Sequence, residues 1–317
     1  MGIFRFGILG AGNIANYFCS GVKLVEGAEV AAVASKSLQR AKTFAEANGI
    51  ADWYDSYDAL LARQDIDAVY IATTHNFHME LIRKALNAGK PVLCEKAMVL
   101  TEADAREAFD LAREKGLFLM EAMWSRFLPQ YQQARRWIAE GRIGAIQSAA
   151  CSIGFRANQD PEGRILNPKL AGGALYDIGV YAIEPLTYLL GEPVEEVMGV
   201  WRPHKVTGVD ERVTLILRFP SCDAVIQASI AANPKEYYYI SGDWGYIEIP
   251  FVTFGDTVRL FDENRNLVEE VVDHWENGFV YEIREVIRCV REGRTVSETM
   301  PPEATIECAR IYDKILG

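Results

Sequence analysis

The chain has 317 residues, of which half are hydrophobic and 24% are charged, and its formal net charge is −11 at pH 7. This length predicts two domains rather than a single core. The acidic balance, with no basic cluster to offset it, argues against nucleic acid or an anionic membrane surface as a partner. No apolar run reaches the roughly 20 residues of a membrane-spanning helix, and the apolar opening stretch is typical of a buried strand rather than a secretory leader. We therefore expect a cytoplasmic protein.

Cysteine and histidine usage agrees with this expectation and favours no metal. The six cysteines are scattered without a C-x-x-C spacing, which is typical of reduced, buried thiols in a cytosolic protein. Of the four histidines, His75 and His78 are close in sequence, but no third ligand accompanies them. A bound metal ion is therefore not expected.

The first part of the chain alternates short apolar runs with helical patterns. The runs are nearly continuous, as in strands buried on both faces, at Phe4–Leu9, Glu29–Ala34, Ala68–Ala72, Val92–Cys94 and Leu117–Met120. Helices are predicted between and after them at Ile14–Leu24, Leu38–Asn48, Tyr57–Ala62, Phe77–Ala88 and Glu102–Lys115. This alternation predicts a parallel, doubly wound sheet, and we place a Rossmann domain over residues 1–123.

The pattern changes after about residue 124, where apolar and polar residues alternate as in half-exposed antiparallel strands. Such segments are Ile146–Gly154, Val194–Trp201, Val213–Phe219, Ala224–Ala231, Glu236–Ser241, Gly245–Ile249, Val258–Phe261 and Leu267–Val272. Helices are predicted at Tyr131–Glu140, Gly179–Leu190, Tyr281–Glu292 and Pro302–Leu316. Residues 124–317 are thus predicted to form an α/β domain with a large, mostly antiparallel sheet, open on one face. The run Tyr237–Tyr239 and nearby Trp244 predict a dimer interface there or, equally, a strand half in the core.

A glycine-rich turn follows the first predicted strand. The stretch Gly7–Ala15 contains G-x-G-x-x-A, in which Gly10 permits a tight turn and Gly12 lets backbone amides approach a pyrophosphate. The phosphates would rest on the helix that begins at Asn13 and Ile14. Because the motif opens a βαβ unit, it predicts a dinucleotide site, although a glycine turn that binds nothing is the alternative.

The end of the second strand bears on the choice between NAD and NADP. An NAD site usually has an acid there to hold the ribose 2′-hydroxyl, but the sequence instead has Ser35, Lys36 and Ser37, with Arg40 one turn later. These side chains could receive a 2′-phosphate, so NADP is preferred over NAD. The alternative is that Lys36 and Arg40 are ordinary surface cations.

Three further segments carry a resemblance to a known family. Thr73–His78 and Cys94–Ala97 each follow a strand of the first domain, and Gly172–Tyr181 opens the helix after the first strand of the second. With the glycine turn, they resemble the glucose–fructose oxidoreductase / inositol dehydrogenase (Gfo/Idh/MocA) family over essentially the whole chain. The stretch Val92–Pro129 is most similar to the dimeric dihydrodiol dehydrogenase branch, which is NADP-linked and also oxidises aldopyranoses.

The resemblance implies a Rossmann domain, a second domain whose open sheet forms a homodimer or homotetramer, and a small sugar, polyol or diol as substrate. It also implies residue roles. Lys96 matches the lysine of the family's Glu-Lys-Pro motif, close to the nicotinamide, and Asp177 matches an aspartate that contacts substrate. Tyr181 falls where many members have histidine and the dihydrodiol branch has tyrosine.

Further implied cofactor contacts are Glu95, which matches the motif's glutamate, and Thr73 and His78 in the loop after the third predicted strand. Trp124, Arg126 and Phe155 are candidates to line the substrate pocket, or equally residues of the core or of a salt bridge. Ala97 departs from the family's usual proline and so removes a backbone restraint after Lys96.

These residue types fit alcohol oxidation. A free tyrosine has a pKa of about 10, too high for an easy base at neutral pH, and a nearby ammonium would lower it. We expect Tyr181 as acid/base, Lys96 as its electrostatic partner and Asp177 as an anchor for a substrate hydroxyl. Each has a structural alternative: Lys96 as a surface lysine, Asp177 as a helix cap and Tyr181 as a packed aromatic.

The leading hypothesis is therefore an NADP(H)-dependent oxidoreductase that transfers a hydride between nicotinamide and a sugar, polyol or vicinal diol. The main alternative is a cofactor-binding sensor without turnover on the same fold, which the presence of Lys96, Asp177 and Tyr181 disfavours. A third possibility is a bilin- or imine-type reductase, because fold does not determine substrate.

Overall fold

The computed structural model describes residues 2–317, which fall into two compact units. The first unit comprises the chain up to Val99, Ala103–Trp124 and Asn277–Pro302, and the second comprises Leu100–Glu102, Ser125–Glu276 and Glu303–Gly317. The chain thus returns to the first unit near its end. The domain boundary predicted after residue 123 stays a prediction.

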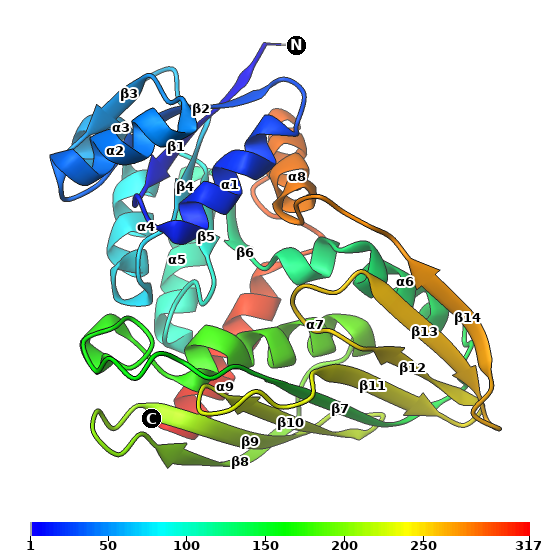
Figure 1. Ribbon diagram of the computed structural model, residues 1–317. Coiled ribbons are helices and arrows are strands. Elements are labelled where there is room, and N and C mark those ends of the chain that lie inside the picture. Colours follow the sequence, from blue (N-terminus) through cyan, green and yellow to red (C-terminus); the bar gives the residue numbers. More distant parts are fainter. Residues whose placement is uncertain (1) are drawn as a thin grey trace. The chain divides into compact units, whose positions relative to one another are not determined.

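The first unit is built on a six-stranded parallel sheet, in the order β3-β2-β1-β4-β5-β6 (Figure 1). The strands are β1 (Phe4–Leu9), β2 (Ala28–Ala34), β3 (Asp52–Tyr54), β4 (Ala68–Ile71), β5 (Val92–Glu95) and β6 (Leu119–Ala122). The four residues of each of β4, β5 and β6 are all buried, as the apolar runs predict. The strand order reverses between β1 and β4, so the loops after these two strands flank the topological switch point.

Helices cover this sheet: α1 (Asn13–Lys23), α2 (Leu38–Asn48), α3 (Tyr57–Leu61), α4 (His78–Asn87), α5 (Glu102–Lys115) and α8 (Phe279–Arg291). A 3₁₀ turn, η1 (His75–Phe77), precedes α4, and another, η2 (Trp124–Phe127), follows β6. Ser37 begins α2, since its hydroxyl accepts the Arg40 N–H at 3.3 Å, and Gly49 ends it with φ of 73°. The late helix α8 packs beside α1 (Figure 1).

The second unit contains an eight-stranded sheet in the order β14-β13-β12-β11-β7-β10-β9-β8. Its strands are β7 (Ile146–Gly154), β8 (Glu196–Pro203), β9 (Asp210–Arg218), β10 (Asp223–Ser229), β11 (Tyr237–Gly242), β12 (Gly245–Ile249), β13 (Thr257–Asp262) and β14 (Leu267–Val272). Only β7 and β10 pair in parallel, so the predicted mostly antiparallel sheet is confirmed.

Helices α6 (Pro129–Ala139), α7 (Val180–Leu190) and α9 (Pro302–Leu316) lie on one face of this sheet (Figure 1). A 3₁₀ turn, η3 (Pro168–Leu170), and a π-helical turn, η4 (Leu175–Gly179), precede α7. Burial alternates along β9 and β10, so one face of each strand is packed and the other is exposed.

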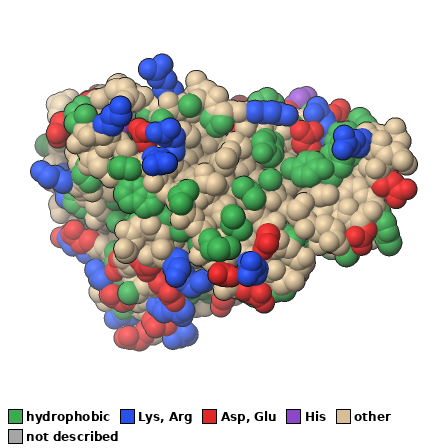
Figure 2. All heavy atoms as spheres, turned by 90° about the horizontal axis from the view of Figure 1, so that it is seen from below, with side chains coloured by type: hydrophobic (Ala, Val, Ile, Leu, Met, Phe, Trp, Pro, Cys, Tyr) green, Lys and Arg blue, Asp and Glu red, His purple; other side chains and the backbone are tan. Residues whose placement is uncertain are grey.

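The open face carries a row of paired residues that crosses all eight strands: Met198, Ile216, Val225, Ala150, Tyr239, Glu248, Arg259 and Glu270. The first four residues of the row are apolar, and the other four are Tyr239 and three charged residues, with Arg259 bonded to Glu270 at 2.5 Å. Figure 2 looks onto this face and shows hydrophobic side chains interspersed with charged ones. No helix of residues 2–317 is long and apolar enough to cross a bilayer.

Candidate active site

The glycine turn after β1 closes against the end of β4. Gly10 has φ of 112°, and a Cβ there would lie 2.7 Å from the Ala72 carbonyl oxygen. A side chain at Gly10 is therefore excluded by both backbone angle and space. Helix α1 begins directly after Gly12, which has no side chain to cap it. The N–H groups of its first turn, with Asn13 and Ile14, are thus available to an anion.

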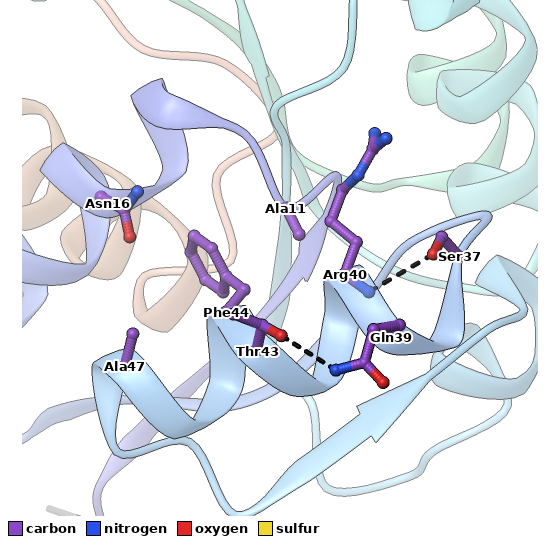
Figure 3. Close-up of a pocket in the computed structure, with 8 residues that line it drawn as sticks. All are labelled: Ala11, Asn16, Ser37, Gln39, Arg40, Thr43, Phe44 and Ala47. Carbon is purple, nitrogen blue, oxygen red and sulfur yellow. Dashed lines mark hydrogen bonds between the residues drawn. The ribbon is translucent and has the colours of Figure 1, made fainter.

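A pocket of about 460 Å³ lies beside this turn, between α1 and α2 (Figure 3). It is lined by Ala11, Asn16, Ser37, Gln39, Arg40, Thr43, Phe44 and Ala47. Figure 3 shows the Arg40 side chain extending from α2 past Ala11. The pocket therefore combines a guanidinium and hydroxyls with an apolar wall, next to the exposed end of α1.

The two cations and two hydroxyls predicted to receive a 2′-phosphate are not equally placed. Arg40 lines the pocket, together with Ser37. Lys36 instead places its ammonium 3.8 Å from the centre of the Phe77 ring. Ser35 is buried, and its backbone N–H donates to the Tyr54 carbonyl at 3.0 Å. Arg40 is thus the cation in a position to contact a phosphate in this pocket.

The residues present fit a dinucleotide. The Gly10 turn leaves space that a Cβ would fill, and α1 has an uncapped N-terminus. In addition, the Thr73 hydroxyl oxygen is buried and has no hydrogen-bond partner among residues 2–317. A buried hydroxyl without a partner is costly unless a ligand or water satisfies it. These features lie on the two loops that flank the switch point.

Two histidines hold the segment that carries Lys96. His75 Nε2 lies 3.2 Å from the Lys96 carbonyl oxygen, and His78 Nδ1 lies 2.9 Å from the Ala97 carbonyl oxygen. The peptide bond between Lys96 and Ala97 is cis. His75 lies in η1 and His78 begins α4, so the η1–α4 junction after β4 anchors the segment after β5. His75 was not among the predicted site residues, although its position in the same loop could have indicated it.

Glu95 is a buried acid immediately before Lys96. The Tyr70 hydroxyl donates a hydrogen bond to its Oε1, and the Lys96 N–H donates to its Oε2 at 3.3 Å. Burial raises the pKa of Glu95 to about 7, against the opposing effects of the Tyr70 hydrogen bond and the Lys96 charge. A carboxyl group that titrates near neutral pH therefore adjoins the predicted lysine.

In the second unit, Asp177 lies on the π-helical turn η4 and is buried. Arg164, which is half-exposed, donates a hydrogen bond to its Oδ1 at 2.6 Å. The pair presents a guanidinium donor beside a carboxylate acceptor, a combination suited to neighbouring hydroxyl groups. Sequence reasoning missed Arg164, because it precedes Asp177 by 13 residues in an irregular loop and only the fold brings them together.

Tyr181 is half-buried at the second position of α7. Its carbonyl oxygen accepts a hydrogen bond from the Tyr238 hydroxyl at 2.5 Å. Tyr238 is the inward-facing member of the tyrosine run on β11 and is almost fully buried, so this part of the run belongs to the core. The sheet thereby supports the backbone at Tyr181.

The remaining candidates lie in packed surroundings. Trp124 is buried and stacks on Phe279, with ring centres 5.3 Å apart. Arg126 forms a buried ion pair with Glu184. Phe155 is half-buried, and its N–H donates to the Ser229 carbonyl at 3.0 Å. A substrate contact of Trp124, Arg126 or Phe155 stays a prediction. Among residues 2–317, no three His, Cys, Asp or Glu side chains are grouped to hold a metal ion.

Comparison with known families agrees with this architecture. Residues 4–123 match the family described as oxidoreductase family, NAD-binding Rossmann fold, and residues 131–248 match the GFO/IDH/MocA C-terminal domain. Together the two matches span more than half of the chain.

Curated relatives align over nearly the full length. The chain is 34% identical to trans-1,2-dihydrobenzene-1,2-diol dehydrogenase of Mus musculus, over 94% of this chain and 91% of the relative. It is 32% identical to D-xylose 1-dehydrogenase (NADP(+)) of Hypocrea jecorina, over 98% of this chain and 91% of the relative.

Solved structures are similar over the same span. An aldose-aldose oxidoreductase from Caulobacter crescentus, complexed with glycerol, has a TM-score of 0.89 at 26% identity, over 99% of this chain and 96% of that one. A 3-ketoreductase from Actinomadura kijaniata, in complex with TDP-benzene and NADP, has a TM-score of 0.87 at 29% identity, over 99% of this chain and 97% of that one.

Proposed function

Because the chain belongs to the Gfo/Idh/MocA oxidoreductase family, we propose that it is an NADP(H)-dependent enzyme that transfers a hydride between nicotinamide and a sugar, polyol or vicinal diol. Its relatives over nearly the whole chain are dehydrogenases and reductases. The protein is therefore an NAD(P)-dependent oxidoreductase acting on CH–OH groups of a sugar or diol. We propose, beyond this activity, a preference for NADP, the roles of individual residues and the assembly of the subunits.

The residues that line the pocket beside the glycine turn support the proposed preference for NADP. Arg40 and Ser37 line it, and no acid stands at the end of β2 to hold a ribose 2′-hydroxyl. A guanidinium forms charge-assisted hydrogen bonds with a phosphate, which supports binding of the 2′-phosphate at Arg40. Relatives named for NADP or complexed with it agree.

Proton transfer is assigned to Tyr181 and Lys96. A bound nicotinamide supplies the hydride chemistry, and the protein must move the proton of the reacting hydroxyl. In oxidation, Tyr181 accepts that proton, and the Lys96 ammonium stabilises the phenolate. In reduction, the same pair donates the proton. The anchoring of Lys96 by His75 supports a fixed position for this amine.

Substrate binding is assigned to Asp177 and Arg164. The carboxylate accepts a hydrogen bond from one substrate hydroxyl, and the adjacent guanidinium donates to a second oxygen. Adjacent donor and acceptor groups favour a substrate with neighbouring oxygens, such as a pyranose or a vicinal diol, over a simple alcohol.

Turnover with NADP tests the proposal. The purified protein is mixed with NADP and, in turn, D-xylose, D-glucose, myo-inositol and 1,2-cyclohexanediol, and the absorbance of the reduced cofactor is followed. We expect the protein to reduce NADP faster than it reduces NAD. Lys96→Met should lower kcat by about two orders of magnitude or more, as the loss of charge stabilisation in a transition state does.

Lys84→Met is the matched control, since Lys84 lies on the surface of α4 and pairs with Asp58 at 3.4 Å. Its kcat should equal that of the unaltered protein. Tight binding of NADP without turnover of any substrate in the panel would instead favour the cofactor-binding sensor.

We further propose that the open sheet face forms a homodimer or homotetramer. Met198, Ile216 and Val225 are each more than a third exposed and adjoin one another on three paired strands. Exposed apolar side chains in a contiguous patch are characteristic of interfaces. A two-fold axis would pair identical surfaces, as in most homodimers.

A further inference from the structure

A buried carboxylate caps the turn that carries Asp177. Asp210, the first residue of β9, is 3% exposed, and its Oδ2 accepts the Leu175 N–H at 2.7 Å. The Ala174 N–H also bonds to this carboxylate. Leu175 begins the π-helical turn, whose first N–H groups have no partner earlier in the helix. Asp210 therefore supplies from β9 a cap that Ala174, at the N-cap position, cannot provide.

Two glycines make this approach possible. Gly173 has φ of 129°, and a Cβ there would overlap Asp210 Oδ1. A Cβ at Gly172 would lie 2.5 Å from the Ile165 carbonyl oxygen and 2.8 Å from that of Arg164. The pair of glycines thus packs against the Asp210 carboxylate on one side and the backbone that carries Arg164 on the other.

The distances along the chain are short. Asp177 follows the bonded Leu175 by two residues, within the same turn, and Tyr181 follows it by six, at the start of α7. A hydrogen-bonded turn has little freedom over so short a span, so its anchored end constrains both side chains, and the Tyr238 bond to the Tyr181 carbonyl oxygen supports the other end. Asp177 in turn meets Arg164 from the segment against which the glycines pack.

We propose that Asp210 is a positioning residue for the substrate: it fixes the start of the π-helical turn and thereby places Asp177 beside Arg164 and orients Tyr181. This inference rests on the roles proposed above for Asp177 and Tyr181. Burial raises the pKa of Asp210 to about 7, and the backbone N–H groups oppose that shift, so a pH above this value favours the carboxylate form.

The test is made at about pH 8 with NADP and D-xylose, or whichever sugar or diol of the panel is turned over fastest. Asp210→Ala should lower kcat/KM by about tenfold or more, because it removes the charge-assisted hydrogen bonds from the Leu175 and Ala174 N–H groups. The Kd for NADP should not change, because the residues proposed to bind it lie on other elements. Asp210→Asn retains an oxygen that can accept the Leu175 N–H, so it should recover most of the lost kcat/KM.

Gly173→Ala provides a second route to the same defect, since its methyl group would displace the Asp210 carboxylate, and it also serves if Asp210→Ala fails to fold. Asp262→Asn is the matched control. Its carboxylate likewise accepts backbone N–H groups, from Asn264 at 2.9 Å and Asn266 at 2.8 Å, but in the turn between β13 and β14. This variant should keep the kcat/KM of the unaltered protein.

Unchanged kcat/KM in Asp210→Ala and Gly173→Ala would overturn the positioning role. An equal loss in Asp210→Ala and Asp210→Asn, with weaker NADP binding in both, would also overturn it in favour of a general folding defect. Asp177→Ala and Tyr181→Phe separate the two proposals. If these two variants are inactive while Asp210→Ala is fully active, only the positioning inference fails; if they are fully active, the proposed substrate site itself fails.

Discussion

The Nδ1 atom of His78 lies 2.9 Å from the carbonyl oxygen of Ala97, the residue after Lys96. The Nε2 atom of the same ring lies 3.1 Å from the Thr73 carbonyl oxygen. Burial lowers the pKa of His78, which favours the neutral ring. A neutral imidazole has a single N–H, so His78 donates to one of these carbonyls at a time. It joins the loop after β4 to the segment that carries Lys96.

Replacing this histidine should loosen that segment. His78→Leu removes the donor from a buried contact with the Ala97 carbonyl oxygen, so the free energy of unfolding should fall by about 1–3 kcal/mol. Urea denaturation measures this change, and kcat with NADP should fall as well because Lys96 is less firmly placed. His204→Leu is the control, since its ring contacts Thr207 within one turn. Equal stability of the two variants would rule out the anchoring role of His78.

Arg40→Gln should alter the choice of cofactor. If its guanidinium binds the 2′-phosphate, its loss should raise the Kd for NADP about tenfold to a hundredfold, as one or two charge-assisted hydrogen bonds are lost. The Kd for NAD should change little, because NAD has no 2′-phosphate. Titration of protein fluorescence with each cofactor measures both constants. Lys42→Gln on the same helix is the control, because Lys42 does not line the pocket. If Arg40→Gln raised the Kd for NAD and the Kd for NADP by the same factor, a contact between Arg40 and the 2′-phosphate would be contradicted.

Much of this fold follows from residue periodicity. The ends of α2, α5, β7, β12, β14 and α9 agree with the predicted segments, and in α2 the Ser37 cap and Gly49 mark the two ends. The short edge strand Asp52–Tyr54 was not predicted, because three residues are too few to show a periodic signal. The packing of α8 beside α1 was not predicted either, because amphipathic periodicity identifies a helix but not its partner.

Some residues of the candidate site can likewise be predicted from the sequence, whereas others are identified only by the fold. The glycine turn and Lys96 follow motifs, so sequence reasoning could find them. Arg164 and Asp210 could not be found, because each acts through a contact with a residue distant in sequence. Arg40 was predicted with Lys36, but only the structure places Arg40 in the pocket and Lys36 over Phe77.

Glu282 should make the protein less stable as pH rises. This residue of α8 is fully buried, and neither of its carboxyl oxygens has a hydrogen-bond partner among residues 2–317. Burial, with a smaller effect of the Glu95 charge, raises the pKa of Glu282 well above 4.5. When the pKa of a group is higher in the folded state, the group contributes its full stability at a pH below its pKa in the unfolded chain. This contribution is lost as the pH rises toward the pKa of the group in the folded protein.

Glu282→Gln removes this titration while keeping the shape of the side chain. The free energy of unfolding of the variant should therefore fall less between about pH 5 and pH 9 than that of the unaltered protein. Urea denaturation across this range measures the difference. Glu263→Gln, in the exposed turn between β13 and β14, should leave the pH dependence unchanged. If the unaltered protein and Glu282→Gln showed the same slope, Glu282 would not be the titrating group.

Val225→Glu should separate the subunits if the open sheet face is the interface. Val225 is 43% exposed at the centre of the apolar half of the residue row, between Ile216 and Ala150. A carboxylate there would have to be buried on association, and a two-fold axis would bring two such charges together, so assembly should be strongly disfavoured. Light scattering after size exclusion gives the mass of each variant. Val206→Glu, at a 77% exposed position between β8 and β9, should keep the unaltered mass. An unchanged mass for Val225→Glu, in a protein that does associate, would place the interface elsewhere.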